Sequence, residues 1–205
     1  MEPIEPPVHD ARIARTRRKL HEAALALAAK QPIESVTVAD LTRTARINRS
    51  TFYKHASSPG EALQQALYDT LDERRDELVH TARDVNLSLA RVWEQSLAGF
   101  AEYLRRFEGV YTTGLVGGHS PALRHLVAQH FAAAVADVLT SRPGVIPAEY
   151  PRDPVAITTY SRFIGHGLLG AVETWLELPV PRDPQVYVRT VLAVMPEWLV
   201  APAGG

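Results

Sequence analysis

The chain of 205 residues is long enough for one large domain or two modest ones, and its hydrophobic fraction of 46% can fill a core. It contains no cysteine, which excludes a disulfide framework, a thiolate metal site and a cysteine nucleophile. The N-terminus lacks the pattern of a secretory signal, and no uncharged apolar stretch reaches the about 18 residues of a membrane span. We therefore expect a soluble, cytoplasmic protein without a membrane partner.

The formal net charge of -1 hides an uneven distribution along the chain. Residues 11–55 carry ten Lys or Arg against three acidic residues, a net charge of +7, and the remainder holds the compensating acid. A basic N-terminal segment on an acidic body favours an anionic partner. Nucleic acid is favoured over a membrane surface, because the basic residues do not lie on one long amphipathic helix. The alternative is a solvated charged surface without a partner.

The first predicted elements are an arm and a helix. Prolines interrupt residues 1–10, which are predicted to be disordered, and Asp10 is placed to cap a helix that runs to about Lys30. The buried stripe of this helix is expected to consist of Ile13, Leu20, Ala24, Leu27 and Ala28. Pro32 ends the helix, and Ile33 and Val36 in the linker that follows are expected in the core.

Two short capped helices come next. Thr37 and Asp40 have the spacing of a capping box, which predicts a helix ending near Thr44, and Asn48 caps a predicted helix over 49–55. Val38, Leu41, Ala45, Ile47 and Phe52 fit between two helices that cross steeply. The opposite face of the second helix carries hydroxyl and cationic donors: Arg49, Ser50, Thr51, Tyr53 and Lys54. We interpret residues 37–55 as a helix-turn-helix that can enter the major groove of DNA, with a plain helical hairpin as the alternative.

The rest of the chain is also predicted to be helical. Ser58 and Pro59 indicate the start of a long charged helix that runs to about Thr81. Helical periodicity also marks residues 87–110, 120–140, 154–177 and 183–200. The expected fold is therefore all-α with about nine helices. The expected organisation is a disordered arm (1–10), a helix-turn-helix domain (11–58) and a C-terminal ligand-binding and dimerisation domain (59–205).

The sequence Thr-Val-x-Asp-Leu at 37–41, followed by Ala-x-Ile-Asn-Arg-Ser-Thr-Phe-Tyr-Lys-His at 45–55, resembles the N-terminal signature of the TetR family of transcriptional regulators. The resemblance is close over residues 15–70. It implies a homodimeric repressor without enzymatic activity, which binds a palindromic operator in double-stranded DNA and is released by a small-molecule effector. It also implies roles for single residues: phosphate contacts by Thr51 and Tyr53, base contacts by Arg49 and Ser50, a cap near a phosphate by Thr37, and a helix-closing histidine at His55.

Three departures from the family pattern lie in the same segment. Arg46 occupies a turn position where glycine is usual; a left-handed arginine there costs roughly 1 kcal/mol, and its charge is suited to DNA. Ala56 replaces a bulky aromatic residue. Residues 57–60 are one residue longer than usual and lack a lysine, so phosphate contacts from the next helix lose their usual donor.

Residues 165–170 have the glycine spacing of a dinucleotide-binding loop. Only 35 residues follow, too few for the parallel sheet that such a loop serves, so we interpret the glycines as sites where helices approach closely. The helices over 154–177 and 183–200 are expected to form a four-helix bundle with a second copy. Burial of the same residues within one chain is the alternative. The candidate interface residues are Phe163, Gly167, Leu168, Val172, Trp175, Val191, Leu192, Met195 and Trp198.

Other chemistries find little support. His125 and His130 are five residues apart without an acid at helical spacing, and His119 and His166 add no metal-site pattern, so no metal or cofactor is expected. Ser120 lies outside any G-x-S-x-G turn, which argues against a hydrolase.

The C-terminal body is rich in aromatic residues. These suit either a pocket for an apolar or amphipathic ligand or a plain core: Trp93, Phe100, Tyr103, Phe107, Tyr111, Phe131, Tyr160 and Phe163. The competing functions are a helical enzyme or lipid-binding protein without DNA binding, and a DNA-binding protein without an effector. The basic N-terminal segment disfavours the first of these.

Overall fold

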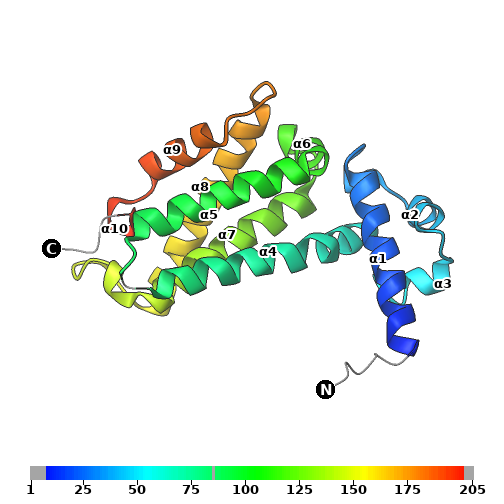
Figure 1. Ribbon diagram of the computed structural model, residues 1–205, viewed down its shortest axis with the longest axis horizontal. Coiled ribbons are helices and arrows are strands. Elements are labelled where there is room, and N and C mark those ends of the chain that lie inside the picture. The colour runs from blue at the N-terminus through cyan, green and yellow to red at the C-terminus, as the bar shows by residue number, and fades with distance from the viewer. Residues whose placement is uncertain (1–7, 85, 201–205) are drawn as a thin grey trace, which may run out of the picture.

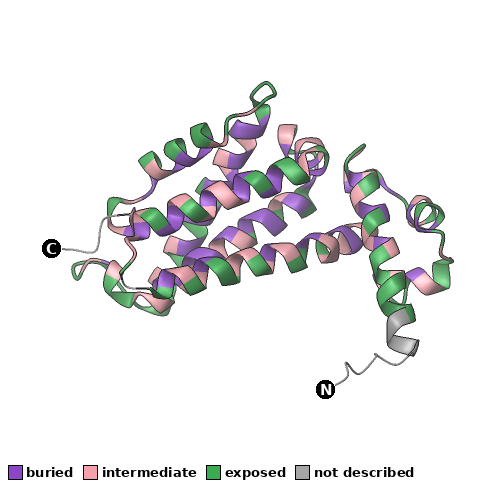
Figure 2. Cartoon of the chain, viewed as in Figure 1, coloured by how far each residue is buried: buried purple, intermediate pink, exposed green. Residues whose placement is uncertain are grey.

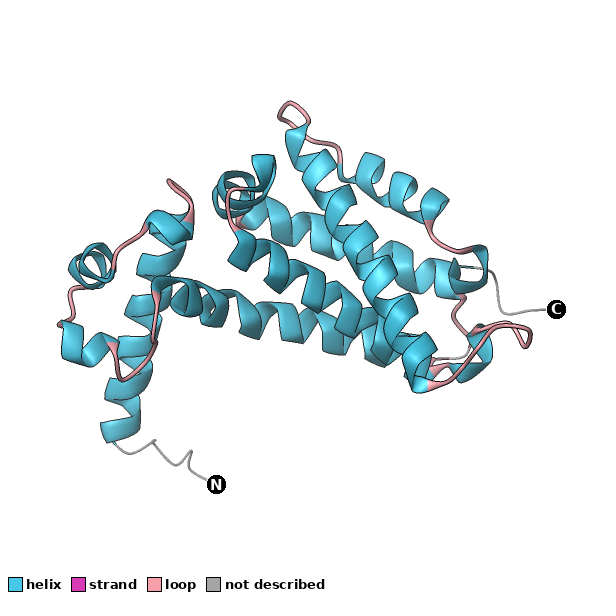
Figure 3. Cartoon of the chain, turned by 180° about the vertical axis from the view of Figure 1, so that it is seen from behind, coloured by secondary structure: helices cyan, strands magenta, loops and turns pink. Residues whose placement is uncertain are grey.

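The computed structural model describes residues 8–84 and 86–200, in which it contains ten α-helices, three short 3-10 helices and no strand (Figure 1, Figure 3). The predicted all-α fold is confirmed. Residues 1–7 of the predicted arm lie outside the described residues, and residues 8–10 are helical instead of disordered. Asp10 lies inside the first helix and does not cap it, because that helix already begins at Val8. No helix in the described part of the chain has the length and apolarity to cross a membrane.

The first four helices form the head of the molecule and its link to the body. Helices α1 (Val8–Ala28), α2 (Val38–Ala45) and α3 (Arg49–Phe52) lie at one end, with a 3-10 helix, η1 (Ile33–Ser35), between α1 and α2 (Figure 1). Helix α4 (Pro59–Arg83) starts in the head and runs the length of the body (Figure 1). Ser58 caps it and Pro59 opens its first turn, as predicted.

The body consists of the remaining helices. Its elements are α5 (Leu89–Arg106), α6 (Glu108–Leu115), η2 (Val116–Gly118), α7 (Pro121–Ser141), η3 (Pro143–Val145), α8 (Pro154–Glu177), α9 (Pro184–Val194) and α10 (Glu197–Val200). Helix α7 packs against both α4 and α8, and α9 packs against α5. The buried residues form one core that continues from the head into the body.

Two predicted helices are each broken in the structure. The helix expected over 87–110 turns at Phe107, which lets α6 pack against the end of α1; there, a Cβ on Gly109 would lie 3.1 Å from the Cβ of Ala29. The helix expected over 183–200 breaks at Met195, which is extended because the next residue is proline.

The buried stripe of α1 starts later than the sequence suggests. Leu20, Ala24 and Ala28 are buried and Leu27 packs against the core, but Ile13 is 43% exposed. Residues 12–15 of α1 are all exposed (Figure 2). The apolar periodicity of the sequence therefore predicted a longer buried stripe on α1 than the structure contains.

Candidate nucleic-acid interface

Helix α2 begins and ends as the sequence predicts. The amide of Asp40 donates to Thr37 Oγ1 at 3.1 Å, and the amide of Thr37 donates to Asp40 Oδ2 at 3.3 Å. Hydrogen bonds from Thr37 and Arg43 lower the pKa of Asp40, so its carboxylate stays charged beside the helix N-terminus. The helix ends at Ala45 and is followed by Arg46, whose φ of 53° is left-handed, the conformation expected at a turn position that glycine usually occupies.

Helix α3 is capped as predicted but shorter. Asn48 Oδ1 accepts from the amide of Thr51 at 2.7 Å and from the hydroxyl of Ser50 at 2.8 Å. The helix ends at Phe52 instead of His55, because the amides of Lys54 and His55 bond to carbonyls only three residues back. This tighter turn leads directly into Ala56, which is buried.

The two rings at the end of α3 serve different purposes. Phe52 is fully buried, and Tyr53 contacts it edge to face with 5.1 Å between centroids. Tyr53 is itself 55% exposed. The predicted DNA-binding residues Thr37, Arg46, Arg49, Ser50, Tyr53 and Lys54 are exposed, and Thr51 and His55 are half-buried. The buried Phe52 thus anchors a short helix whose outer residues remain available to a partner.

His55 lies on the side of the head that faces α1 and α4. Its carbonyl accepts a hydrogen bond of 3.2 Å from Gln65 on α4. Its side chain lines a hollow of about 560 Å³ together with residues of α1 and α4, among them His21 and Tyr68. His55 therefore joins the end of α3 to the long helix of the body.

The aromatic residues of the body do not form one pocket. Phe100, Tyr103, Phe107, Tyr111 and Phe131 form a cluster with ring centroids 4.8 to 5.7 Å apart. Tyr111 donates its hydroxyl hydrogen to Tyr103 at 2.9 Å, and burial raises the pKa of Tyr103 to about 12. Trp93 joins Phe100 and Phe131 around a small cavity. Most of the predicted pocket residues are thus packed core.

Two aromatic residues lie elsewhere. Tyr160 packs against Trp198, and its hydroxyl donates to the carbonyl of Pro151 at 3.2 Å. Phe163 is 80% exposed, so its assignment to a pocket is wrong. Helix α8 turns Ile164 and Leu168 toward the core, and Phe163 lies on its exposed side.

Most of the residues predicted to form the dimer interface are buried inside the chain, where a second copy cannot contact them. Leu168, Val172, Trp175, Val191 and Met195 are buried within the chain. Leu192 and Trp198 are half-buried against the core. Gly165 lets α8 approach α7, since a Cβ there would lie 2.7 Å from the amide nitrogen of Ala132. A Cβ on Gly167, by contrast, would meet nothing within 4 Å, so this glycine lies on an open face.

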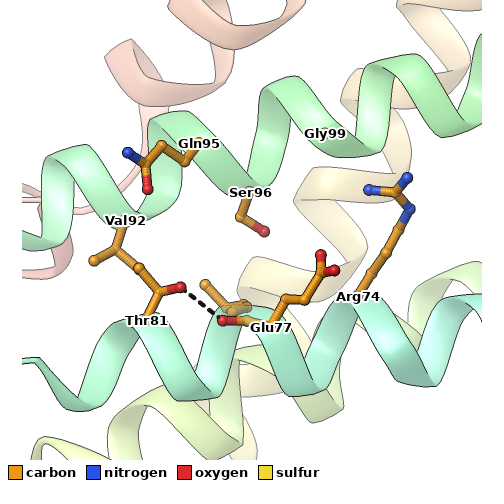
Figure 4. A pocket seen from close by; sticks show the side chains of 8 residues that line it. Arg74, Glu77, Thr81, Val92, Gln95, Ser96 and Gly99 are labelled. Atoms are coloured by element: carbon orange, nitrogen blue, oxygen red, sulfur yellow. Dashed lines mark hydrogen bonds between the residues drawn. The ribbon is translucent and has the colours of Figure 1, made fainter.

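Sequence reasoning missed a polar cleft between α4 and α5. Arg74, Glu77 and Thr81 line it from α4, and Gln95, Ser96 and Gly99 line it from α5 (Figure 4). No spacing within either helix indicates such a site, because packing alone brings the two faces together. In the described residues, no group of three or more His, Asp or Glu is arranged to hold a metal ion.

The fold and the exposed α3 define a helix-turn-helix protein with a helical C-terminal body, and comparisons with known proteins agree. Residues 20–59 match the model of the bacterial regulatory proteins of the tetR family. Over 90 residues, 43% of this chain, the sequence is 37% identical to the uncharacterized HTH-type transcriptional regulator YxbF of Bacillus subtilis (strain 168). That match covers only 23% of the length of YxbF.

Solved structures match the whole fold. A TetR transcriptional regulator from Streptococcus agalactiae 2603V superposes with a TM-score of 0.63 at 16% identity, over 91% of this chain and 96% of that one. Thermus thermophilus FadR, solved with lauroyl-CoA, gives 0.65 at 17% identity, over 92% and 99%. RolR, solved with resorcinol, gives 0.55 at 18% identity, over 96% and 98%.

Residues 20–59 thus resemble the DNA-binding segment of tetR-family regulatory proteins, and the described chain shares its overall fold with a solved TetR transcriptional regulator. The matched family, YxbF and the Streptococcus agalactiae structure are all named as regulators of transcription or as regulatory proteins.

Proposed function

We propose that this protein is a DNA-binding repressor that, as a homodimer, binds a palindromic operator and leaves it when a small apolar or amphipathic molecule binds the body. The observation that carries the proposal is the head itself. Two capped helices joined at Arg46 expose the cationic and hydroxyl donors of α3. The head lies within the part of the chain with the +7 charge. Such a surface is suited to phosphates and to the major groove.

The exposed residues differ in the contacts that they are suited to make. Tyr53 and Lys54 follow the last turn of α3 and have one donor group each for phosphate. Arg49, in the first turn, carries a guanidinium that fits guanine O6 and N7. The hydroxyl of Ser50 already donates to Asn48, so it meets a base only as an acceptor unless that cap opens. We therefore propose Arg49 as the main base-reading residue.

An outward-facing strip of α8 supports the homodimer. It includes Val155, Phe163 and Gly167, all exposed, and Val194 on α9 is exposed as well. Large apolar side chains of this kind mark association surfaces when they gather on one face. A second copy packed on the same strip forms a two-fold bundle, and its two heads then face two half-sites about 34 to 36 Å apart or a multiple of this.

Helix α4 supports ligand control, because it belongs to both the head and the body. Near its start, Gln65 bonds to His55 and Asp69 pairs with Arg17 of α1 at 3.8 Å. Further along, it lines the cleft with α5. A ligand that displaces α4 therefore tilts the head and changes the spacing of the two copies of α3. Equal Tyr53–Tyr53 distances in DNA-bound and ligand-bound dimers would contradict this mechanism.

The deciding experiment is selection of binding sites from random double-stranded DNA. Wild type is expected to select a palindrome, and Arg49→Ala is expected to lose preference at one symmetric base pair per half-site, which costs about 1 to 3 kcal/mol. Arg105→Ala, on the exposed side of α5, is the matched control. Compounds are then screened for release of the selected DNA. Failure to select any DNA would instead favour a helical ligand-binding protein without DNA binding.

A further inference from the structure

The cleft between α4 and α5 has a volume of about 270 Å³ and continues toward the aromatic cluster. A second, inner cavity of about 20 Å³ shares Arg74, Leu78 and Ser96 with the cleft. The inner cavity is lined beyond these residues by Trp93, Phe100 and Phe131, among others. The site therefore has a polar mouth and an apolar end.

Three buried donors of this site have no hydrogen-bond partner among the described residues, and one of them, Arg75 Nε, is instead in an ion pair of 3.2 Å with Asp137 Oδ2. Trp93 is only 2% exposed, and its buried Nε1 has no acceptor. The buried Nε of Arg74 has none either. Within the described residues no carboxylate lies within ion-pair distance of Arg74, whereas the neighbouring Arg75 pairs with Asp72 and Asp137. Buried donors of this kind usually have an acceptor. Trp93 Nε1 and Arg74 Nε can therefore each bind an acceptor atom of a ligand.

The guanidinium of Arg74 occupies space that is free because residue 99 is glycine. Its guanidinium lies over the ring of Tyr103, with 5.3 Å from Cζ to the ring centroid. A Cβ on Gly99 would lie 3.0 Å from Nη1 of Arg74, so glycine at this position leaves room for the cation. In Figure 4, Arg74 projects from α4 toward Gly99 on α5. Arg74 is thus held across the cleft without an anionic partner.

Three basic side chains line the inner cavity: Arg74, Arg75 and His130. His130 lines it, and burial lowers the pKa of His130 to about 4, with the charges of Arg75 and Arg74 acting in the same direction. No carboxylate offsets this effect on the pKa of His130. The side chain of Glu77 also projects into the cleft (Figure 4), but no ion pair joins it to Arg74, and water screens its charge because the residue is exposed.

We propose that this cleft binds an amphipathic molecule with an anionic head group, which pairs with Arg74 while its apolar part enters the cavity between Trp93, Phe100 and Phe131. This inference rests on the proposed function and names the chemical class of the effector. An anion satisfies the free donors of Arg74 with strong, charge-assisted hydrogen bonds. An uncharged ligand of the same shape leaves the charge of Arg74 unpaired.

The size of the inner cavity connects this ligand to the head. At about 20 Å³ it has room for about one water molecule, so an alkyl or aryl group enters only when α4 and α5 separate. A ligand that binds the separated form better shifts the protein toward it. Because α4 begins in the head and its Gln65 donates to the carbonyl of His55 just after α3, the anionic ligand acts on a helix that contacts the DNA-binding segment.

The test measures binding to the full-length protein without DNA, by isothermal titration calorimetry. The probes share one chain: octanoate, octyl phosphate, 1-octanol and octylammonium. Both anions are expected to bind at least about tenfold more tightly than octanol, the effect of hydrogen bonds to a charged group, and octylammonium more weakly still. The two anions distinguish a carboxylate from a phosphate head group. Equal binding of octanoate, octyl phosphate and octanol overturns the proposal.

Variants assign the effect to Arg74. Arg74→Gln is expected to weaken the binding of octanoate about tenfold or more and to leave that of octanol unchanged, while Arg74→Lys retains most of the preference. Glu77→Gln is expected to strengthen the binding of octanoate, since it removes a like charge at the mouth. Arg105→Gln is the exposed control. An unchanged preference in a folded Arg74→Gln protein, checked by circular dichroism, overturns the proposal.

Operator binding is measured separately by mobility shift. If the protein binds the selected DNA but does not prefer octanoate, only the proposal of an anionic ligand is contradicted. Octanoate binding that depends on Arg74, by a protein that selects no DNA, contradicts only the proposed DNA-binding function.

Discussion

The carboxylate of Glu34 accepts a hydrogen bond of 2.8 Å from the hydroxyl of Ser120, across 86 positions of the chain. Glu34 belongs to η1 in the head, and Ser120 caps α7 in the body. The same carboxylate oxygen also accepts from the amide of Ala122 at 3.1 Å. One head residue therefore satisfies two donors at the start of a body helix, where a negative charge is favourable.

We predict that Glu34→Gln loosens the junction between head and body. A hydrogen bond to a charged group contributes about 1.5 to 3 kcal/mol when sheltered, and the partial exposure of this one places the expected loss of stability near 1 kcal/mol. Urea unfolding measures the loss, with Glu22→Gln as the control because Glu22 is exposed and, among the described residues, forms an ion pair with Arg18 alone. A loss equal to that of the control would mean that the contact contributes nothing.

Replacing Arg46 by glycine is expected to stabilise the head. The left-handed backbone of Arg46 costs a residue with a Cβ about 1 kcal/mol, which glycine avoids. The thermal unfolding midpoint is the measurement. Arg43→Gly is the matched control, since Arg43 lies within α2 and loses helix stability as glycine. A lower midpoint for Arg46→Gly than for wild type would contradict the account.

Lys54 is expected to contribute charge but no sequence preference. Lys54→Ala should weaken specific and non-specific DNA alike and reduce the slope of log affinity against log salt by about 0.9 per lost phosphate contact. Fluorescence anisotropy at several salt concentrations gives this slope. A changed preferred sequence with an unchanged slope would instead assign Lys54 to base contacts.

The outer face of α8 is expected to control the oligomeric state. Gly167→Arg places a charge on this open face and is expected to give a folded monomer of 22.6 kDa. Light scattering at micromolar concentration tests this. Trp175→Glu has a different expected effect, because Trp175 is buried and an unpaired charge there destabilises the protomer itself. A wild-type monomer would contradict the homodimer.

Stability is expected to fall as the pH decreases from about 6.5 to 4. The pKa of His130 is about 4 in the folded protein and near 6.5 when exposed, so in this range the unfolded chain binds a proton that the folded protein excludes. The contribution approaches about 3 kcal/mol at the lower limit. Urea unfolding at pH 7 and pH 4.5 compares wild type with His130→Gln, which is expected to lose less. His166→Gln, on an exposed residue of α8, is the control.

Local sequence was sufficient for the features that depend on a few neighbouring residues. The caps at Thr37, Asn48 and Ser58 and the left-handed turn at Arg46 lie where the sequence predicts them. Each depends on hydrogen bonds or backbone preferences within about four residues, and these do not require the rest of the fold.

Tertiary packing decided the features that involve distant segments. Packing of helix α8 against its neighbours, mainly α7, buries Leu168 and Val172 and leaves Phe163 exposed. The Glu34–Ser120 contact and the approach of Arg74 to Gly99 also join residues that share no sequence pattern. Periodicity identifies an apolar face, but the neighbour that covers it depends on how helices far apart in the chain pack together.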